Sequence, residues 1–147
     1  MLLVEEINKI KSIFIDTAPI IYYIEAHPEF GPLVKQIMEI LSQGRLTVFS
    51  SVLTLTEVLV KPVQLGREYL VVEFINFLTN GLCLVEIDPI IAERAGRLKG
   101  KYFSLRTLDA LQISAALSVN VDAFLTNDKN LTQIEEIRIL LLKDYLS

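Results

Sequence analysis

Short runs of consecutive apolar residues alternate along this chain with longer stretches in which apolar residues recur every three or four positions. The short runs predict buried strands, and the longer stretches predict helices with one apolar face. The strands are expected at residues 12–15, 46–49, 83–87, 123–126 and 138–146. Strands that alternate with helices indicate parallel βαβ units, so the predicted fold class is α/β: a three-layer α/β/α sandwich with a central parallel sheet of about five strands.

Length, composition and net charge limit the number of domains and the classes of protein to which this chain can belong. Its 147 residues, of which 52% are hydrophobic, predict a single domain over residues 1–147, with residues 1–11 as a short N-terminal extension. No apolar run approaches the roughly 18 residues that cross a bilayer. We therefore expect no membrane association and a cytoplasmic location. The net charge of −4 argues against nucleic-acid binding through bulk charge, although it leaves room for a local basic groove.

Three further features concern cysteine, histidine and one unusually apolar helix. The single cysteine, Cys83, excludes an internal disulfide and is predicted to be a buried small hydrophobe. The single histidine, His27, makes a zinc site unfavourable. The helix expected at residues 68–78 is apolar almost all round, which predicts that its second face meets another chain. That face would be buried in a homodimer or against a bound partner protein.

Four acidic residues follow predicted strands or lie on helices that leave the strand ends: Asp16, Glu57, Asp109 and Asp128. The carboxyl ends of parallel strands share one edge of a sheet, where ligands bind. Carboxylates that converge there repel one another unless a divalent cation neutralises them. Such a cation can activate water and stabilise charge on a phosphoryl group, which is the chemistry of phosphodiester hydrolysis. Asp88 also follows a strand, so position alone does not separate it from the four.

Each of the four acids also has a purely structural explanation. Asp16 can cap the helix that follows it, and Asp128 can form a turn. Glu57 can face solvent in a polar stripe that also contains Thr54. Asp109 can interact with the dipole of its helix. The coincidence of four such positions, rather than any one of them, favours a site.

Four segments in order, IDTAPIIYYIE, SSVLTLTEVLV, LRTLDALQISAAL and FLTNDKNL, resemble the PIN domain (PilT N-terminus-like) family, and in particular the VapC-type toxin ribonucleases. The resemblance spans about residues 13–146. It implies a metal-dependent endoribonuclease that hydrolyses phosphodiester bonds in single-stranded RNA. It also implies a toxin that an antitoxin protein inhibits.

The resemblance assigns roles to individual residues. The family's acidic quartet corresponds to the residues expected to bind Mg²⁺ or Mn²⁺ and to support catalysis, namely Asp16, Glu57, Asp109 and Asp128. The attacking water would be activated by metal, with no side-chain nucleophile. The residues expected to contact substrate are Thr17, Thr126 and Asn127, which lie beside the first and last acids of the quartet. Arg106 is added to them as a phosphate contact because it precedes Asp109 by one turn or less. Leu108 departs from the proline often found before the third acid, which affects only the geometry of the helix start.

Other functions fit the sequence less well. A haloacid-dehalogenase-like phosphatase needs a second aspartate where Ala18 stands, and a response-regulator receiver needs an acidic pair at the first strand. The alternative that stays open is a PIN-like binding or assembly module with little or no nuclease activity. A basic stripe at Arg94, Arg97 and Lys101 has either a phosphate-binding role or a solvated one.

Overall fold

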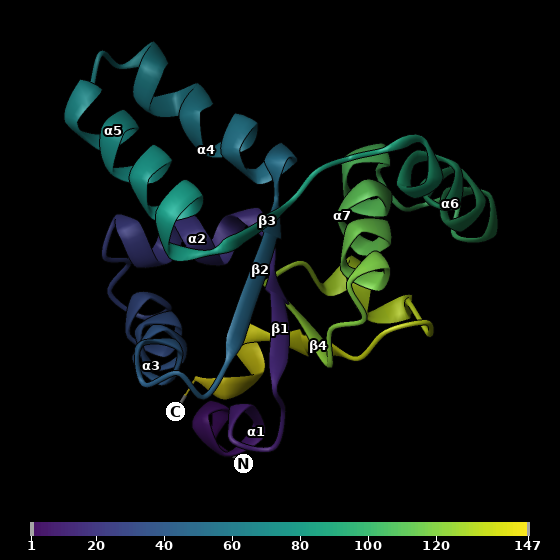
Figure 1. Ribbon diagram of the computed structural model, residues 1–147, viewed down its shortest axis with the longest axis horizontal. Coiled ribbons are helices and arrows are strands. Elements are labelled where there is room, and N and C mark those ends of the chain that lie inside the picture. The colour runs from purple at the N-terminus through teal and green to yellow at the C-terminus, as the bar shows by residue number, and fades with distance from the viewer. Residues whose placement is uncertain (1, 147) are drawn as a thin grey trace.

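A five-stranded, all-parallel sheet forms the centre of the computed structural model, which describes residues 2–146 (Figure 1). Met1, in the predicted extension, and Ser147 lie outside the described residues. The strand order is β3-β2-β1-β4-β5. The strands are β1 (Ser12–Ile15), β2 (Thr47–Ser51), β3 (Cys83–Val85), β4 (Ala123–Thr126) and β5 (Ile139–Leu141). The predicted α/β class and the parallel sheet are confirmed.

Helices cover both faces of the sheet and complete the three layers (Figure 1). One layer contains α2 (Thr17–Ile24), α3 (Gly31–Ser42), α4 (Val52–Gln64) and α5 (Glu68–Asn76), which a single π turn, η1 (Phe77–Gly81), extends. The other layer contains α6 (Pro89–Lys101) and α7 (Thr107–Ser118). None of the helices in residues 2–146 combines the length and the apolar character needed to cross a membrane.

The central strand β1 is apolar throughout because both of its faces are covered. Ile13 and Ile15 point into the core shared with α2–α5, whereas Phe14 between them points into the core shared with α6 and α7. Phe14 stacks on Phe124 of β4, with ring centroids 5.2 Å apart. This packing fixes the register of the two strands whose ends carry Asp16 and Thr126.

The N-terminal extension is a packed part of the fold. Its helix, α1 (Leu3–Ile7), buries Leu3 and Ile7 in the same core as α2–α5. Glu6 forms an ion pair with Arg138. The Asp122 carboxylate, just before β4, accepts hydrogen bonds from the backbone N–H groups of residues 11 and 12. The extension is therefore tied to the start of β1 and to the segment that leads into β4.

Two sequence predictions at the sheet edges are wrong in detail. β5 stops at Leu141, and residues expected to continue it form a 3₁₀ turn, η3 (Leu142–Tyr145), because Leu142 turns into the core. Cys83 is exposed rather than buried, because β3 is an edge strand with a neighbour on one side only. An apolar run does not by itself distinguish a short strand from a helical turn.

The second apolar face of α5 is open in this single chain. Its exposed apolar residues, together with those of the neighbouring α4, are Val60, Val63, Tyr69, Val72 and Ile75. The two helices form an antiparallel hairpin that extends away from the sheet (Figure 1). Exposure of several large apolar side chains on one projecting hairpin fits the expectation of a protein partner.

Candidate active site

Asp16 lies where β1 ends and α2 begins, and its side chain is 9% exposed. As the N-cap of α2, it accepts a hydrogen bond at Oδ1 from the backbone N–H of Thr17 at 2.9 Å. The Thr126 hydroxyl of the adjacent strand β4 donates to Oδ2 at 2.8 Å. Both oxygens are therefore oriented by the sheet and the helix start, so capping is part of the arrangement rather than an alternative to it.

The environment of Asp16 disfavours its charge. Burial is the main cause that raises the pKa of this carboxyl group from 3.8 to about 6. The hydrogen bonds from Thr126 and Thr17 oppose the shift, while the negative charges of Asp109 and Glu57 add to it. The charges of Asp109 and Glu57 therefore act on Asp16, so the three carboxylates lie close enough to repel one another.

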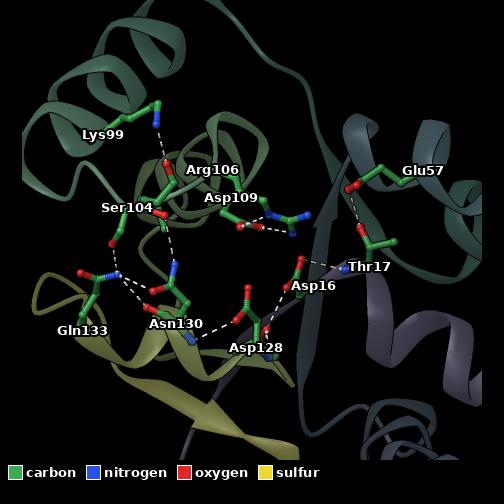
Figure 2. A network of polar contacts seen from close by, with 12 residues as sticks. Asp16, Thr17, Glu57, Lys99, Ser104, Arg106, Asp109, Asp128, Asn130 and Gln133 are labelled. Carbon is green, nitrogen blue, oxygen red and sulfur yellow. Dashed lines mark hydrogen bonds and ion pairs between the residues drawn. The ribbon is translucent and has the colours of Figure 1, made fainter.

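Asp109 lies in the first turn of α7 and is 4% exposed. Its two carboxylate oxygens accept hydrogen bonds from Arg106, Nε to Oδ2 at 2.8 Å and Nη2 to Oδ1 at 3.2 Å (Figure 2). The Arg106 side chain is itself 71% exposed, and its hydrogen bonds to Asp109, followed by the charge of Asp109, raise its pKa. A buried aspartate is thus paired with a cation that reaches in from solvent.

Glu57 and Asp128 complete the acidic set from two further elements. Glu57, on α4, accepts a hydrogen bond at Oε1 from the Thr17 hydroxyl at 2.8 Å (Figure 2). Asp128 caps the 3₁₀ turn η2 (Lys129–Gln133), accepting from the backbone N–H of Asn130 at 2.9 Å. Its own backbone N–H donates to Thr126 Oγ1 at 3.1 Å.

All eight residues predicted for the site line a single cavity of about 430 Å³ at the carboxyl ends of the strands. Tyr22 lines it as well and accepts a hydrogen bond from Asn127 Nδ2 at 3.3 Å. Asp88 is not among the lining residues: it caps α6 by accepting from the backbone N–H of Ile91 at 2.8 Å. The structure therefore separates Asp88 from the four acids, which sequence position could not do.

The basic stripe on α6 lies apart from this cavity. Arg94, Arg97 and Lys101 line a different hollow of about 510 Å³ beside α7. Lys101 there pairs with Glu136 at 3.3 Å, and Arg97 is 3.9 Å from Glu93. None of these three side chains lines the acidic cavity, whereas Arg106 does, so Arg106 is the basic residue of the site.

The family model of the PIN domain matches residues 13–137. The chain belongs to the PIN domain family. That span includes β1 to β4, all four acids and their hydrogen-bonding partners Thr17 and Thr126. A search of the curated proteins finds no match.

Solved structures share the fold of this PIN domain at low sequence identity. A chain of the VapBC2 complex from Rickettsia felis, bound to a DNA fragment from its promoter, superposes with a TM-score of 0.73 at 16% identity, covering 88% of this chain and 98% of that one. DNA-bound VapBC from Salmonella typhimurium gives 0.72 at 20%, covering 90% and 98%. VapC20 from Mycobacterium tuberculosis, a toxin that cleaves the sarcin-ricin loop, gives 0.66 at 13%, covering 86% and 98%.

The acids of this PIN domain do not form a preassembled metal site. Within residues 2–146, no three His, Cys, Asp or Glu side chains are grouped closely enough to hold a metal ion. Two of the acids are engaged by other side chains, Asp109 by Arg106 and Glu57 by Thr17. The donor chemistry nevertheless suits a hard cation, since every candidate ligand is an oxygen and the like charges around Asp16 favour a positive neighbour.

A buried polar network that the sequence did not predict links α7 of the PIN domain to α4. Gln112, one turn after Asp109, donates from Nε2 to Thr54 Oγ1 at 2.7 Å and accepts a short hydrogen bond from Ser51 Oγ. Thr54 is buried rather than part of a solvent-facing stripe with Glu57. The available signal was a glutamine between the apolar residues Leu111 and Ile113 of a helix expected to be closely packed, because a buried glutamine needs buried partners.

Gln112→Leu should lower the free energy of unfolding by about 1–3 kcal/mol, because it removes the acceptor of Ser51 and a donor to Thr54 inside the core. Urea denaturation would measure the loss. Gln36→Leu makes the same chemical change at an exposed position of α3 and should stay within about 0.5 kcal/mol of the wild type. Equal stabilities for the two variants would contradict the structural role of the network.

Proposed function

We propose that this PIN domain is a metal-dependent endoribonuclease that hydrolyses phosphodiester bonds in single-stranded RNA. The observation that supports this most is the convergence of Asp16, Glu57, Asp109 and Asp128, from different strand ends and helices, on one cavity. The structural alternatives of capping, dipole interaction and turn formation explain each residue separately. They do not explain why four carboxylates share one hollow that raises the pKa of Asp16.

In this proposal Asp16 and Asp109 are the principal ligands of Mg²⁺ or Mn²⁺, and Glu57 and Asp128 bind directly or through water. The cation would supply an activated water and neutralise charge on the scissile phosphate. The protein supplies orientation. Thr126 and the N–H of Thr17 hold both oxygens of Asp16, so this ligand loses little freedom on binding.

Arg106 is the proposed phosphate contact. Its guanidinium lies in the cavity, is largely exposed, and meets the Asp109 carboxylate through two nitrogens, a geometry that matches a phosphate equally well. Thr17, Thr126 and Asn127 also line the cavity, but their polar groups are engaged by Glu57, Asp16 and Tyr22. Their role next to the substrate is therefore to hold these groups in place.

A toxin–antitoxin role is the biological setting that we propose for this activity, in the cytoplasm. The solved structures with this fold include VapBC complexes and an RNA-cleaving toxin. The exposed apolar face of the α4–α5 hairpin would be covered by an antitoxin or by a second copy in a homodimer. A PIN-like binding or assembly module without nuclease activity is the competing proposal, since carboxylates can bind metal without holding a phosphate in line.

The deciding experiment is cleavage of a mixed-sequence single-stranded RNA in Mg²⁺, Mn²⁺ and EDTA. We expect cutting with either metal, none in EDTA, and none by Asp109→Asn purified identically, which also exposes contaminating ribonuclease. Asp88→Asn is the matched control, because Asp88 follows a strand but caps α6 outside the cavity and asparagine caps equally well. An inert wild type that still binds Mn²⁺ would favour the binding-module proposal.

A further inference from the structure

Phe103 is the most exposed large apolar side chain in residues 2–146, at 86%. It lies in the loop between α6 and α7, residues 102–106, which ends at Arg106. Its neighbours in the chain are the partly buried Tyr102 and the polar Ser104, so Phe103 is not part of an apolar patch like that on the α4–α5 hairpin. A single exposed aromatic ring next to a candidate nuclease cavity needs an explanation of its own.

The backbone that presents Phe103 is fixed. Lys99 Nζ donates to the carbonyl oxygens of Leu105 at 2.7 Å and of Phe103 at 3.3 Å, and Leu105 is fully buried in the core. The exposure of the ring is therefore a property of an ordered loop. An aromatic side chain on a fixed backbone can bind a flat partner at little cost in conformational entropy.

The 102–106 loop is also hydrogen-bonded to η2, the turn that Asp128 caps. Asn130 Nδ2 donates to the carbonyl oxygen of Ser104 at 3.3 Å, and the backbone N–H of Asn130 donates to Asp128 (Figure 2). Phe103 is three residues from Arg106, a separation of at most about 10 Å along the chain. If the phosphate of one nucleotide binds Arg106, the bases of the adjacent nucleotides therefore lie within reach of the Phe103 ring.

We propose that Phe103 is a stacking platform for one base of the single-stranded RNA whose phosphate lies at Arg106. The inference rests on the proposed ribonuclease function and adds a base subsite to it. Every base has a π face, so such a platform binds unpaired bases with little regard to sequence. In a duplex the bases are already stacked, so the subsite also accounts for a preference for single strands.

Binding of a fluorescently labelled single-stranded RNA, measured by anisotropy in EDTA, separates affinity from cleavage. We expect Phe103→Ala to weaken binding about 5- to 150-fold, the range for loss of one stacked base. Phe103→Trp should restore wild-type affinity, whereas Phe103→Leu, which is apolar without a π face, should not. Ile90→Ala removes a comparably exposed apolar side chain on α6 that does not line the cavity, and should bind like the wild type. A duplex RNA should not distinguish Phe103→Ala from the wild type.

The outcomes distinguish this inference from the proposed nuclease activity. If Phe103→Ala binds RNA as tightly as the wild type, or if the wild type does not bind RNA, the stacking platform is wrong, even where metal-dependent cleavage is found. If Phe103→Ala binds weakly but the wild type never cuts, the base subsite stands and the nuclease proposal fails. If Phe103→Leu binds like the wild type, the ring makes an apolar contact and the stacking assignment is overturned.

Discussion

Asp16→Asn should stabilise the metal-free protein at pH 7 while reducing RNA cleavage by about 10²–10³-fold or more. The two effects have one cause, a carboxylate that is 9% exposed and surrounded by like charges. The asparagine removes the buried charge and with it a principal metal ligand. A stability gain that accompanies loss of activity is the signature of a group held in place for function.

The stability gain has a defined pH dependence. The pKa of Asp16 is 3.8 in the unfolded chain and about 6 in the folded one, so the folded state holds the proton more tightly. Wild-type stability therefore falls as pH rises through this window, and above about pH 6 the full penalty of about 3 kcal/mol applies. Asp16→Asn lacks this dependence. Its advantage should be absent below about pH 4 and reach about 1–3 kcal/mol at pH 7, after the lost hydrogen bond from Thr126 is deducted.

Urea denaturation in EDTA at pH 4, 5.5 and 7 would measure this advantage, because the difference between the two proteins cancels the other titrating groups. Asp88→Asn provides the reference for an exposed acid and should show no comparable gain at pH 7. A constant difference between the wild type and Asp16→Asn across the three pH values would show that burial and like charges do not destabilise Asp16.

Mn²⁺ or Mg²⁺ should raise the melting temperature of the wild-type protein. At a hundredfold excess of metal over Kd, the free energy of unfolding should rise by about 2.7 kcal/mol. For a chain of this size that corresponds to about 5–10 °C. The shift should be largely lost in Asp16→Asn. It should be larger in Arg106→Ala, because the guanidinium occupies the place of a cation beside Asp109 and its charge is attracted by Asp128 and Glu57 as well.

Differential scanning fluorimetry over a metal titration would test this at constant ionic strength, with NaCl as the control for screening. Asp88→Asn should retain the wild-type shift. The absence of any shift at millimolar metal would count against the four acids as a metal site. A smaller shift in Arg106→Ala than in the wild type would show that the arginine assists metal binding instead of competing with it.

Strands β1 and β4 were predictable from sequence, whereas the bounds of the other three were not. The strand expected at residues 46–49 runs instead from Thr47 to Ser51 as β2. The predicted bounds of β1 and β4 are correct, because both strands are covered on two faces and end at capping or turn residues. β3 and β5 have one neighbour each, so their lengths depend on pairing that no local pattern records. The exposure of Cys83 follows from the same edge position.

The convergence of the four acids was predictable for a topological reason, since parallel strands place their carboxyl ends at one edge. The partners of the acids were not. Sequence position suggested Arg106 as a phosphate contact, but it did not show that Arg106 pairs with Asp109. Gln112 and Thr54 became partners because α7 packs against the β2–α4 junction, a contact between residues 58 positions apart. Such distant pairings are set by tertiary packing alone.

The position of β1 between β2 and β4 also determines when the site can form during synthesis of the chain. Asp16 and the Thr126 that orients it are separated by 110 residues, which a ribosome adds in about 5–20 s. Throughout that interval β1 lacks β4 as a neighbour, and the cavity lacks Asp128 for all of it and Asp109 for most of it. A nascent chain therefore carries no complete site. The fold therefore makes any ribonuclease activity depend on the residues up to Asp128 having been synthesised.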